Sequence, residues 1–273
     1  MDATYQSQRQ DWTCWLLACG ILGPAIFVVA FLVEGASRSS YSQLRDYVSE
    51  LSLGTGGWSQ TANFIACGWL VLAFAAGLTR APETVRSATI APALFSILGL
   101  GLVGAGTFRM DPVGSAASLQ GDLHFLATIA IAGSLTAVCL VLGSALGETT
   151  SWSAWGRYSV ATGLIVPVLF VLSNVAPPVL LPGLVQRAAL IVGAGWVALF
   201  AARALRTTYS DRSMRDQRIP RDIKIYPAAR HSFFNHGGRA YQPDAAADSW
   251  QRDIAFFDSH VRNPGSVPHG RAR

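Results

Sequence analysis

Six long apolar runs, separated by short polar segments, fill most of the first 207 residues. A hydrocarbon core about 30 Å thick takes roughly 20 apolar helical residues to cross. Each run meets that length, and a backbone in lipid must satisfy its own hydrogen bonds, so the runs are predicted to be transmembrane helices. Strict two-residue alternation is absent, which disfavours a transmembrane barrel. The runs lie near residues 13–33, 61–79, 88–107, 122–145, 156–176 and 184–204.

Prolines and glycines modify this pattern in two places. The fifth run is the least regular, because Pro167 interrupts it and Pro177 and Pro178 end it. The third run is rich in glycine, including Gly99 and Gly106. Missing side chains let helices approach closely, so these glycines predict tight packing inside the bundle.

The pattern changes beyond residue 207. Residues 208–221 form a basic stretch that we interpret as a linker. Residues 222–262 fit a short strand, a loop carrying His231 and an amphipathic helix. Residues 263–273 are expected to be a disordered tail. In the expected helix the apolar residues recur at helical spacing; they are Ala246, Trp250, Ile254 and Phe257.

Composition agrees with a membrane protein. Hydrophobic residues make up 51% of the chain and charged residues only 14%, whereas soluble domains carry nearer a quarter. With six spans the basic residues divide unequally between the two sides, and the heavier side should be cytoplasmic. That side holds Arg9, Arg80, Arg86, Arg157 and the series from Arg203 to Arg221, against Arg38, Arg45, Arg109 and Arg187 on the other. We therefore expect a multi-pass protein of the cell (inner) membrane with both termini cytoplasmic.

The sequence offers little for metals, cofactors or nucleic acid. Its four cysteines fall inside apolar runs without CxxC spacing, so we interpret them as packing residues. The bundle supplies one histidine, His124, which is too few for a paired-imidazole haem or a zinc centre. The basic residues beside the last span lack an aromatic-interleaved fold signature. We expect no metal, no cofactor and no nucleic-acid partner, and the lipid bilayer as the surroundings of the helices.

Polar and charged residues gather in two loops that share the predicted outer side. One is the loop after the first run, and the other precedes the fourth run. Low dielectric at a span end penalises an unpaired charge, and ionisable groups there often mark function. Two interpretations are open: an outward-facing site for a small polar ligand or an ion, or an ion-pair network that staples the loops together. The residues concerned are Glu34, Arg38, Ser49, Glu50, Asp111 and His124.

Several short motifs in this part of the chain are recognisable. Together they resemble the membrane family catalogued as domain of unknown function 998, over roughly residues 10–207. The resemblance implies a six-helix membrane protein of bacterial or archaeal type. It implies no particular reaction, because that family has no settled activity. The motifs are Gly23-Pro24-Ala25, Glu34-Gly35, Arg38, Tyr41, the run from Val48 to Gly54, Gly57-Trp58, Asn63-Phe64, Phe108, Asp111-Pro112 and His124.

Residues 222–262 resemble the C-terminal end of dienelactone hydrolases, members of the α/β-hydrolase superfamily. The resemblance lies in the stretch from Tyr226-Pro227 through His231 to Asn235, in which His231 matches the triad histidine. The stretch departs from that pattern at Ala228, where glycine is usual. A triad histidine also needs a nucleophile. Neither Gly-x-Ser-x-Gly nor Gly-x-Cys-x-Gly occurs in the chain, so we interpret His231 as orphaned and the fragment as a fusion remnant or docking module.

The predicted fold class is therefore an all-α membrane protein, a bundle of about six transmembrane helices over residues 1–207. A short strand-loop-helix fragment of α/β-hydrolase type follows at its C-terminus. The leading functional prediction is a small transporter or sensor that uses the outer polar site, and not an enzyme. The alternative is a membrane-tethered hydrolase of dienelactone hydrolase type, with His231 as base and the nucleophile supplied by a soluble hydrolase partner.

Overall fold

Helices account for all regular structure in the part of the chain that the computed structural model describes. The described residues are 3–81, 90–147, 153–175, 179, 181–216, 224, 226, 233–234, 236 and 241–262. The chain divides into two units, residues 1–212 and 213–273, which are treated separately below. In chain order the elements are α1 (Ala3–Ser37), the 3-10 helix η1 (Val48–Ser52), α2 (Trp58–Leu78), α3 (Ala91–Thr107), α4 (Leu119–Gly147), α5 (Ser153–Val175), α6 (Pro182–Asp216), α7 (Pro243–Phe257) and the π-helical turn η4 (Asp258–Arg262).

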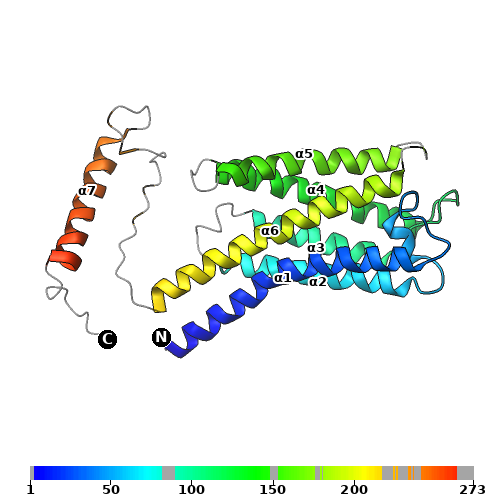
Figure 1. Ribbon diagram of the computed structural model, residues 1–273, viewed down its shortest axis with the longest axis horizontal. Coiled ribbons are helices and arrows are strands. Elements are labelled where there is room, and N and C mark those ends of the chain that lie inside the picture. The colour runs from blue at the N-terminus through cyan, green and yellow to red at the C-terminus, as the bar shows by residue number, and fades with distance from the viewer. Residues whose placement is uncertain are drawn as a thin grey trace. The chain divides into compact units, whose positions relative to one another are not determined.

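The first unit is a bundle of α1 to α6, in which the helices α1 to α5 pack against their neighbours in sequence (Figure 1). Five of the six, α1, α2, α4, α5 and α6, are long and apolar enough to cross a membrane. The remaining helix, α3, is apolar but has 17 residues, which at 1.5 Å per residue span about 25 Å. Helix α5 continues through Pro167. The prediction of an all-α membrane protein is confirmed.

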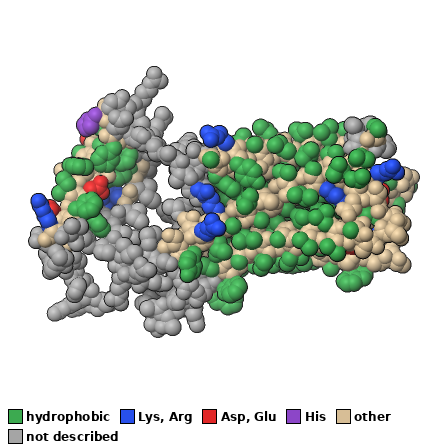
Figure 2. Space-filling model, viewed as in Figure 1, with side chains coloured by type: hydrophobic (Ala, Val, Ile, Leu, Met, Phe, Trp, Pro, Cys, Tyr) green, Lys and Arg blue, Asp and Glu red, His purple; other side chains and the backbone are tan. Residues whose placement is uncertain are grey.

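Large apolar side chains lie on the outside of this bundle. On α1 the residues Leu22, Ile26, Val29 and Val33 recur every three or four positions, and each is more than half exposed. An apolar stripe of this kind is unfavourable in water but suits contact with lipid tails. In Figure 2 hydrophobic side chains cover most of the visible side of the bundle, and most of the visible Lys and Arg side chains lie toward its ends. The exposed stripe supports the membrane assignment independently of helix length.

The interior is held by stacked aromatic rings and by close helix contacts. Trp196 is fully buried, stacks on Phe200 with ring centroids 5.6 Å apart and donates its indole N–H to Ser159 Oγ at 3.0 Å. Gly68 and Gly99 let α2 and α3 touch, since a Cβ added to Gly68 would lie 2.7 Å from the carbonyl oxygen of Gly99. The predicted packing role of the glycines in the third run is confirmed at Gly99.

The second unit contains α7, which confirms the helix predicted near the C-terminus. Ala246 is buried, whereas Trp250 and Phe257 are more than half exposed. Of the predicted strand, Lys224 and Tyr226 are described and are not in a strand. His231 and the predicted tail at 263–273 lie outside the described residues. Helix α6 extends to Asp216, through the first part of the segment that we interpreted as a linker.

Candidate functional site

The loop between α1 and α2 is anchored into one end of the bundle by buried apolar residues. It carries η1, in which Val48 and Leu51 are fully buried. At the other edge of this end, the loop of residues 108–118 connects α3 to α4. We call this region, made of residues 38–57, residues 108–118 and the adjoining helix ends, the loop end. Five of the six residues that the sequence singled out form three arrangements in this region, and the sixth, Glu50, lies apart from them.

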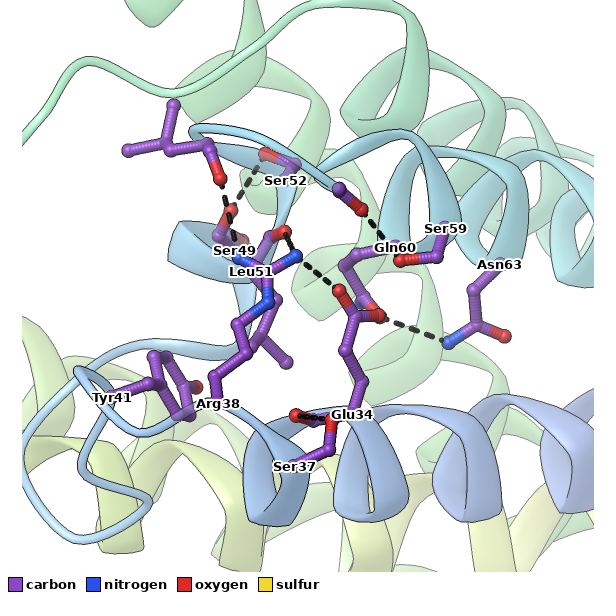
Figure 3. A network of polar contacts seen from close by, with 12 residues as sticks. Glu34, Ser37, Arg38, Tyr41, Ser49, Leu51, Ser52, Ser59, Gln60 and Asn63 are labelled. Carbon is purple, nitrogen blue, oxygen red and sulfur yellow. Dashed lines mark hydrogen bonds and ion pairs between the residues drawn. The ribbon is translucent and has the colours of Figure 1, made fainter.

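Glu34 and Arg38 form the first arrangement, an ion pair at the C-terminus of α1. The Arg38 guanidinium also donates to the carbonyl oxygens of Leu51 at 2.6 Å and Leu53 at 3.2 Å. Figure 3 shows these groups facing one another between α1 and η1. The side chains of Glu34 and Arg38 are 14% and 22% exposed, so the pair neutralises two largely buried charges while it caps the end of η1. This geometry fits the stapling interpretation for both residues.

Asp111 forms the second arrangement, which organises the start of α4. Its carboxylate accepts hydrogen bonds from the backbone N–H of Ser118 at 2.8 Å and from the Ser118 hydroxyl at 2.6 Å. These two bonds lower the pKa of Asp111 below its ordinary value because they favour the charged form. Gly121 permits the approach, since a Cβ there would lie 2.0 Å from Asp111 Oδ2. Asp111 closes its loop and also lines a pocket described below.

Ser49 and His124 form the third arrangement, a buried side-chain pair. His124 Nε2 lies 3.1 Å from Ser49 Oγ, and Nδ1 lies 2.8 Å from the carbonyl oxygen of Phe108 and 3.0 Å from that of Ala105. Carbonyl oxygens only accept hydrogen bonds, so Nδ1 carries the hydrogen and donates it. Nε2 is then free to accept the proton of the Ser49 hydroxyl. Both residues are 5% exposed.

Two pockets of different polarity meet beside this pair. The polar pocket has a volume of about 240 Å³, and its lining includes Tyr47, Asp111, Asp122, His124 and Asn174. The apolar pocket has a volume of about 100 Å³ and is lined by aliphatic and aromatic side chains from inside the bundle, among them Phe27, Phe64, Leu102 and Val197. Four residues line both pockets: Ser49, Thr128, Phe170 and Gln186.

Glu50 lies apart from these pockets and lines neither of them. It is half-buried in the loop. Loss of solvation raises the pKa of its carboxyl group above the ordinary value, and the neighbouring charge of Asp46 raises it further. Of the six predicted residues, the pocket lining therefore includes Ser49, Asp111 and His124, whereas Glu34, Arg38 and Glu50 stand outside it.

Two residues of α6 complete the loop end, and the sequence argument did not include them in the predicted site. Arg187 is 3% exposed and donates to the carbonyl oxygens of Asp46 at 2.8 Å and Gly183 at 3.0 Å, and to the Tyr41 hydroxyl. Gln186 accepts the backbone N–H of Val48 at 2.7 Å. The available signal was a pair of polar residues at the start of an apolar run. Burying polar side chains in a membrane span costs free energy, so such residues often mark a functional site.

The described part of the chain contains no group of three or more His, Cys, Asp or Glu side chains placed to hold a metal ion. The described contacts of the C-terminal unit are of another kind. Asp248 accepts hydrogen bonds from Lys224 Nζ at 2.7 Å and from the Tyr226 hydroxyl. These partners, Lys224 first, lower the pKa of Asp248. This cluster of three side chains joins α7 to the segment before it.

Comparison with known proteins gives two family matches, which overlap at residues 179–203. The dienelactone hydrolase family matches residues 179–261. A protein of Saccharolobus solfataricus whose name places it among the carboxymethylenebutenolidases is 51% identical over 36 residues, 13% of this chain. The chain spans only 14% of the length of that relative. No solved structure matches the chain.

The helical bundle matches a different family. The family described as protein of unknown function (DUF998) matches residues 21–203. That match covers more than half of the chain and includes the second half of α1, α2 to α5 in full, most of α6, and both loops of the loop end. The chain therefore belongs to the DUF998 family of membrane proteins.

Proposed function

We propose that the bundle is a ligand-binding membrane protein, a sensor or a small transporter, whose site consists of the two adjoining pockets at the loop end. The ligand is a small amphipathic molecule. Its polar group occupies the polar pocket beside His124 and Asp111, and its apolar part occupies the pocket inside the bundle. The observation that carries the proposal is that an apolar pocket and a pocket with several polar and charged side chains share Ser49, Thr128 and Gln186 at their boundary.

The chemistry of the lining favours an amphipathic ligand over an inorganic ion. Apart from Cys67, the polar side chains of the apolar pocket are Ser49, Thr128 and Gln186, all at the boundary with the polar pocket. An ion that moved deeper would lose its hydration without gaining ligands, at a cost of many kcal/mol. An alkyl chain or ring gains by leaving water there.

The same proposal places the loop end on the outer side of the cell membrane, with both termini in the cytoplasm. The loop end carries fewer basic residues than the opposite side of the predicted topology, where Arg203 and Arg206 follow the last span. Cytoplasmic segments carry the excess of Lys and Arg. A cysteine introduced at Val113, which is 73% exposed, should react with an impermeant maleimide in intact cells.

The binding proposal is tested with a panel of medium-chain amphiphiles: an alcohol, a carboxylic acid, an ester and an amine of equal chain length. Binding to the full chain in nanodiscs is measured by calorimetry. Ala132→Phe fills the apolar pocket, because Ala132 lines it. Gly133→Phe is the matched control, because Gly133 is exposed and a Cβ there would meet nothing within 4 Å.

We expect saturable binding of at least one member of the panel. Ala132→Phe should abolish it and Gly133→Phe should leave it unchanged. The proposal fails if no member binds, or if both variants bind as the unaltered protein does. Uptake of the bound compound into proteoliposomes then separates a transporter from a sensor.

A second candidate function is hydrolysis of the dienelactone hydrolase type, which the match to the C-terminal unit favours. His231 would act as the base, and the nucleophile would come from a soluble hydrolase partner. The test is turnover of a dienelactone by cell extract containing the full chain, compared with the His231→Ala variant. Turnover that disappears in the variant supports this candidate, and equal turnover in both refutes it.

A further inference from the structure

We infer that Ser49 and His124 are a nucleophile and its general base, and that the bundle cleaves a carboxylic ester of the amphipathic ligand by acyl transfer through Ser49. This inference rests on the proposed ligand site and assigns it a chemistry. The pair comes from two distant segments, η1 and α4, and meets at the boundary of the two pockets.

The hydrogen-bond directions are those that a nucleophile and base require. Nδ1 of His124 donates to the carbonyl oxygens of Phe108 and Ala105, which leaves the lone pair of Nε2 for the Ser49 hydroxyl at 3.1 Å. An activated serine needs a base within hydrogen-bond reach, and the base needs a third group that fixes its tautomer and orientation. In this protein two backbone carbonyls provide that third group.

The Ser49 hydroxyl is used differently from other serine hydroxyls of the bundle. Serines in apolar helices usually donate to the carbonyl of the residue three or four positions earlier. Ser49 instead donates to an imidazole 75 positions away in the sequence. Helical serines that follow the usual pattern include Ser96, Ser134, Ser144 and Ser173.

The position of Ser49 suits an ester whose carbonyl group lies between a polar and an apolar part. Ser49 lines both pockets, so it lies where the polar part of such a ligand would meet its apolar part. Gln186 lines both pockets as well. Its Oε1 accepts the N–H of Val48, and among the described residues none accepts a hydrogen bond from its Nε2. That amide is a donor for the oxyanion that develops on the attacked carbonyl.

The reaction balances with water as the second reactant. Ser49 Oγ bonds to the ester carbonyl carbon, and its proton passes to His124 Nε2. The bond from that carbon to the alkoxy oxygen then breaks, and His124 returns the proton to the departing alkoxide, which leaves as an alcohol. Water, deprotonated by His124, attacks the acyl-serine and releases the carboxylic acid, which restores the Ser49 hydroxyl.

The test uses an alkyl fluorophosphonate of medium chain length on the full chain in nanodiscs, with the labelled residue identified by peptide mass spectrometry. We expect labelling at Ser49 and none in Ser49→Ala. In His124→Gln the labelling rate should fall about 100-fold or more, which is the usual contribution of a general base. Ser52→Ala is the matched control, because Ser52 is buried in the same short helix and lines neither pocket. His231→Ala should label normally.

A second measurement separates this inference from the binding proposal. An alkyl methyl ether of the same chain length resembles the ester but cannot react, and its binding is measured in each variant. If the ether binds and Ser49 is not labelled, the acyl-transfer inference is wrong and the ligand site stands. If neither the ether nor the fluorophosphonate binds, both are wrong. Labelling that is equal in His124→Gln would also overturn the inference.

Discussion

The bundle and the C-terminal unit carry opposite kinds of information about function. The C-terminal unit resembles a named enzyme family, yet its described polar contacts are exposed: the side chains of Lys224 and Asp248 are 43% and 42% exposed. The bundle belongs to a family of unknown function, yet it holds Glu34 and Arg38 at 14% and 22% exposure and His124 at 5%. In this chain, the unit that resembles a named enzyme family is not the unit that buries its polar side chains.

This difference indicates which unit should be tested first for a functional site. Burying a charge or a hydroxyl costs free energy unless its partners are in place, so the buried groups of the loop end require a fixed geometry. An exposed pair between long side chains costs little and stabilises little. The loop end therefore deserves the first experiments, although the sequence comparison names an enzyme at the other end of the chain.

The largest expected effect comes from breaking the Glu34–Arg38 staple. Arg38→Ala leaves the Glu34 carboxylate without its cation and the carbonyls of Leu51 and Leu53 without their donor. We expect a loss of about 2–4 kcal/mol in unfolding free energy, measured by thermal unfolding in detergent. Arg109→Ala is the control, since Arg109 is exposed. Equal losses in the two variants would show that the staple is unimportant.

A smaller loss of unfolding free energy is expected from a substitution where α2 contacts α3. Gly68→Ala would place its Cβ 2.7 Å from the Gly99 carbonyl oxygen and equally close to the Val103 side chain. Overpacking of this kind costs about 1–3 kcal/mol. Gly133→Ala, on α4 with open space around its Cβ, should be neutral or slightly stabilising because alanine favours helix. The packing argument is wrong if Gly68→Ala unfolds at the temperature of the unaltered protein.

Most of the fold could be predicted from the sequence, because lipid demands long apolar helices and leaves few alternatives. The runs near 13–33, 122–145 and 184–204 became α1, α4 and α6 with similar centres. The bounds could not be predicted, since α1 and α6 extend beyond the apolar runs, with α6 ending at Asp216. Hydropathy marks the part of a helix that lies in lipid, and it carries no signal for a polar extension.

The site could be predicted only in part, for a similar reason. Residue types at span ends pointed to Ser49, Asp111 and His124, which do line the polar pocket. The same argument could not distinguish them from Glu34 and Arg38, because partner choice depends on how the loop folds back over the bundle. Gln186 and Arg187 were overlooked although they are polar residues at the start of an apolar run, because their partners lie 138 to 146 positions away in the sequence and could not be predicted.

A pH series sharpens the comparison within the loop end. Burial and the charge of Asp46 raise the pKa of Glu50, so the folded state favours its neutral form. Its contribution to stability is complete below the ordinary carboxyl pKa and is lost as the pH rises through the raised value. Near neutral pH, Glu50→Gln should therefore be more stable than the unaltered protein, by less than about 1 kcal/mol of unfolding free energy after solvent screening. In acid the unfolding free energies of the two proteins should become equal.

Asp111→Asn should show the opposite sign. Hydrogen bonds from Ser118 lower the pKa of Asp111, so its contribution is present above the ordinary carboxyl pKa and is lost as the pH falls through the lowered value. The variant should melt lower than the unaltered protein near neutral pH and approach it in acid. Parallel pH profiles for the Glu50 and Asp111 variants would contradict the assigned environments.

The smallest effect is expected in the C-terminal unit. Lys224→Ala removes the cation beside Asp248, but both side chains are well exposed, so water and salt already screen their attraction. We expect no resolvable change in thermal midpoint at low or high salt, whereas the Arg38→Ala loss should persist at both because that pair is largely buried. A salt-independent loss in Lys224→Ala would mean that the Lys224–Asp248 contact is held as firmly as the staple. There would then be no physical reason to search for a functional site in the bundle before the hydrolase-like unit, and His231 would become the first residue to test.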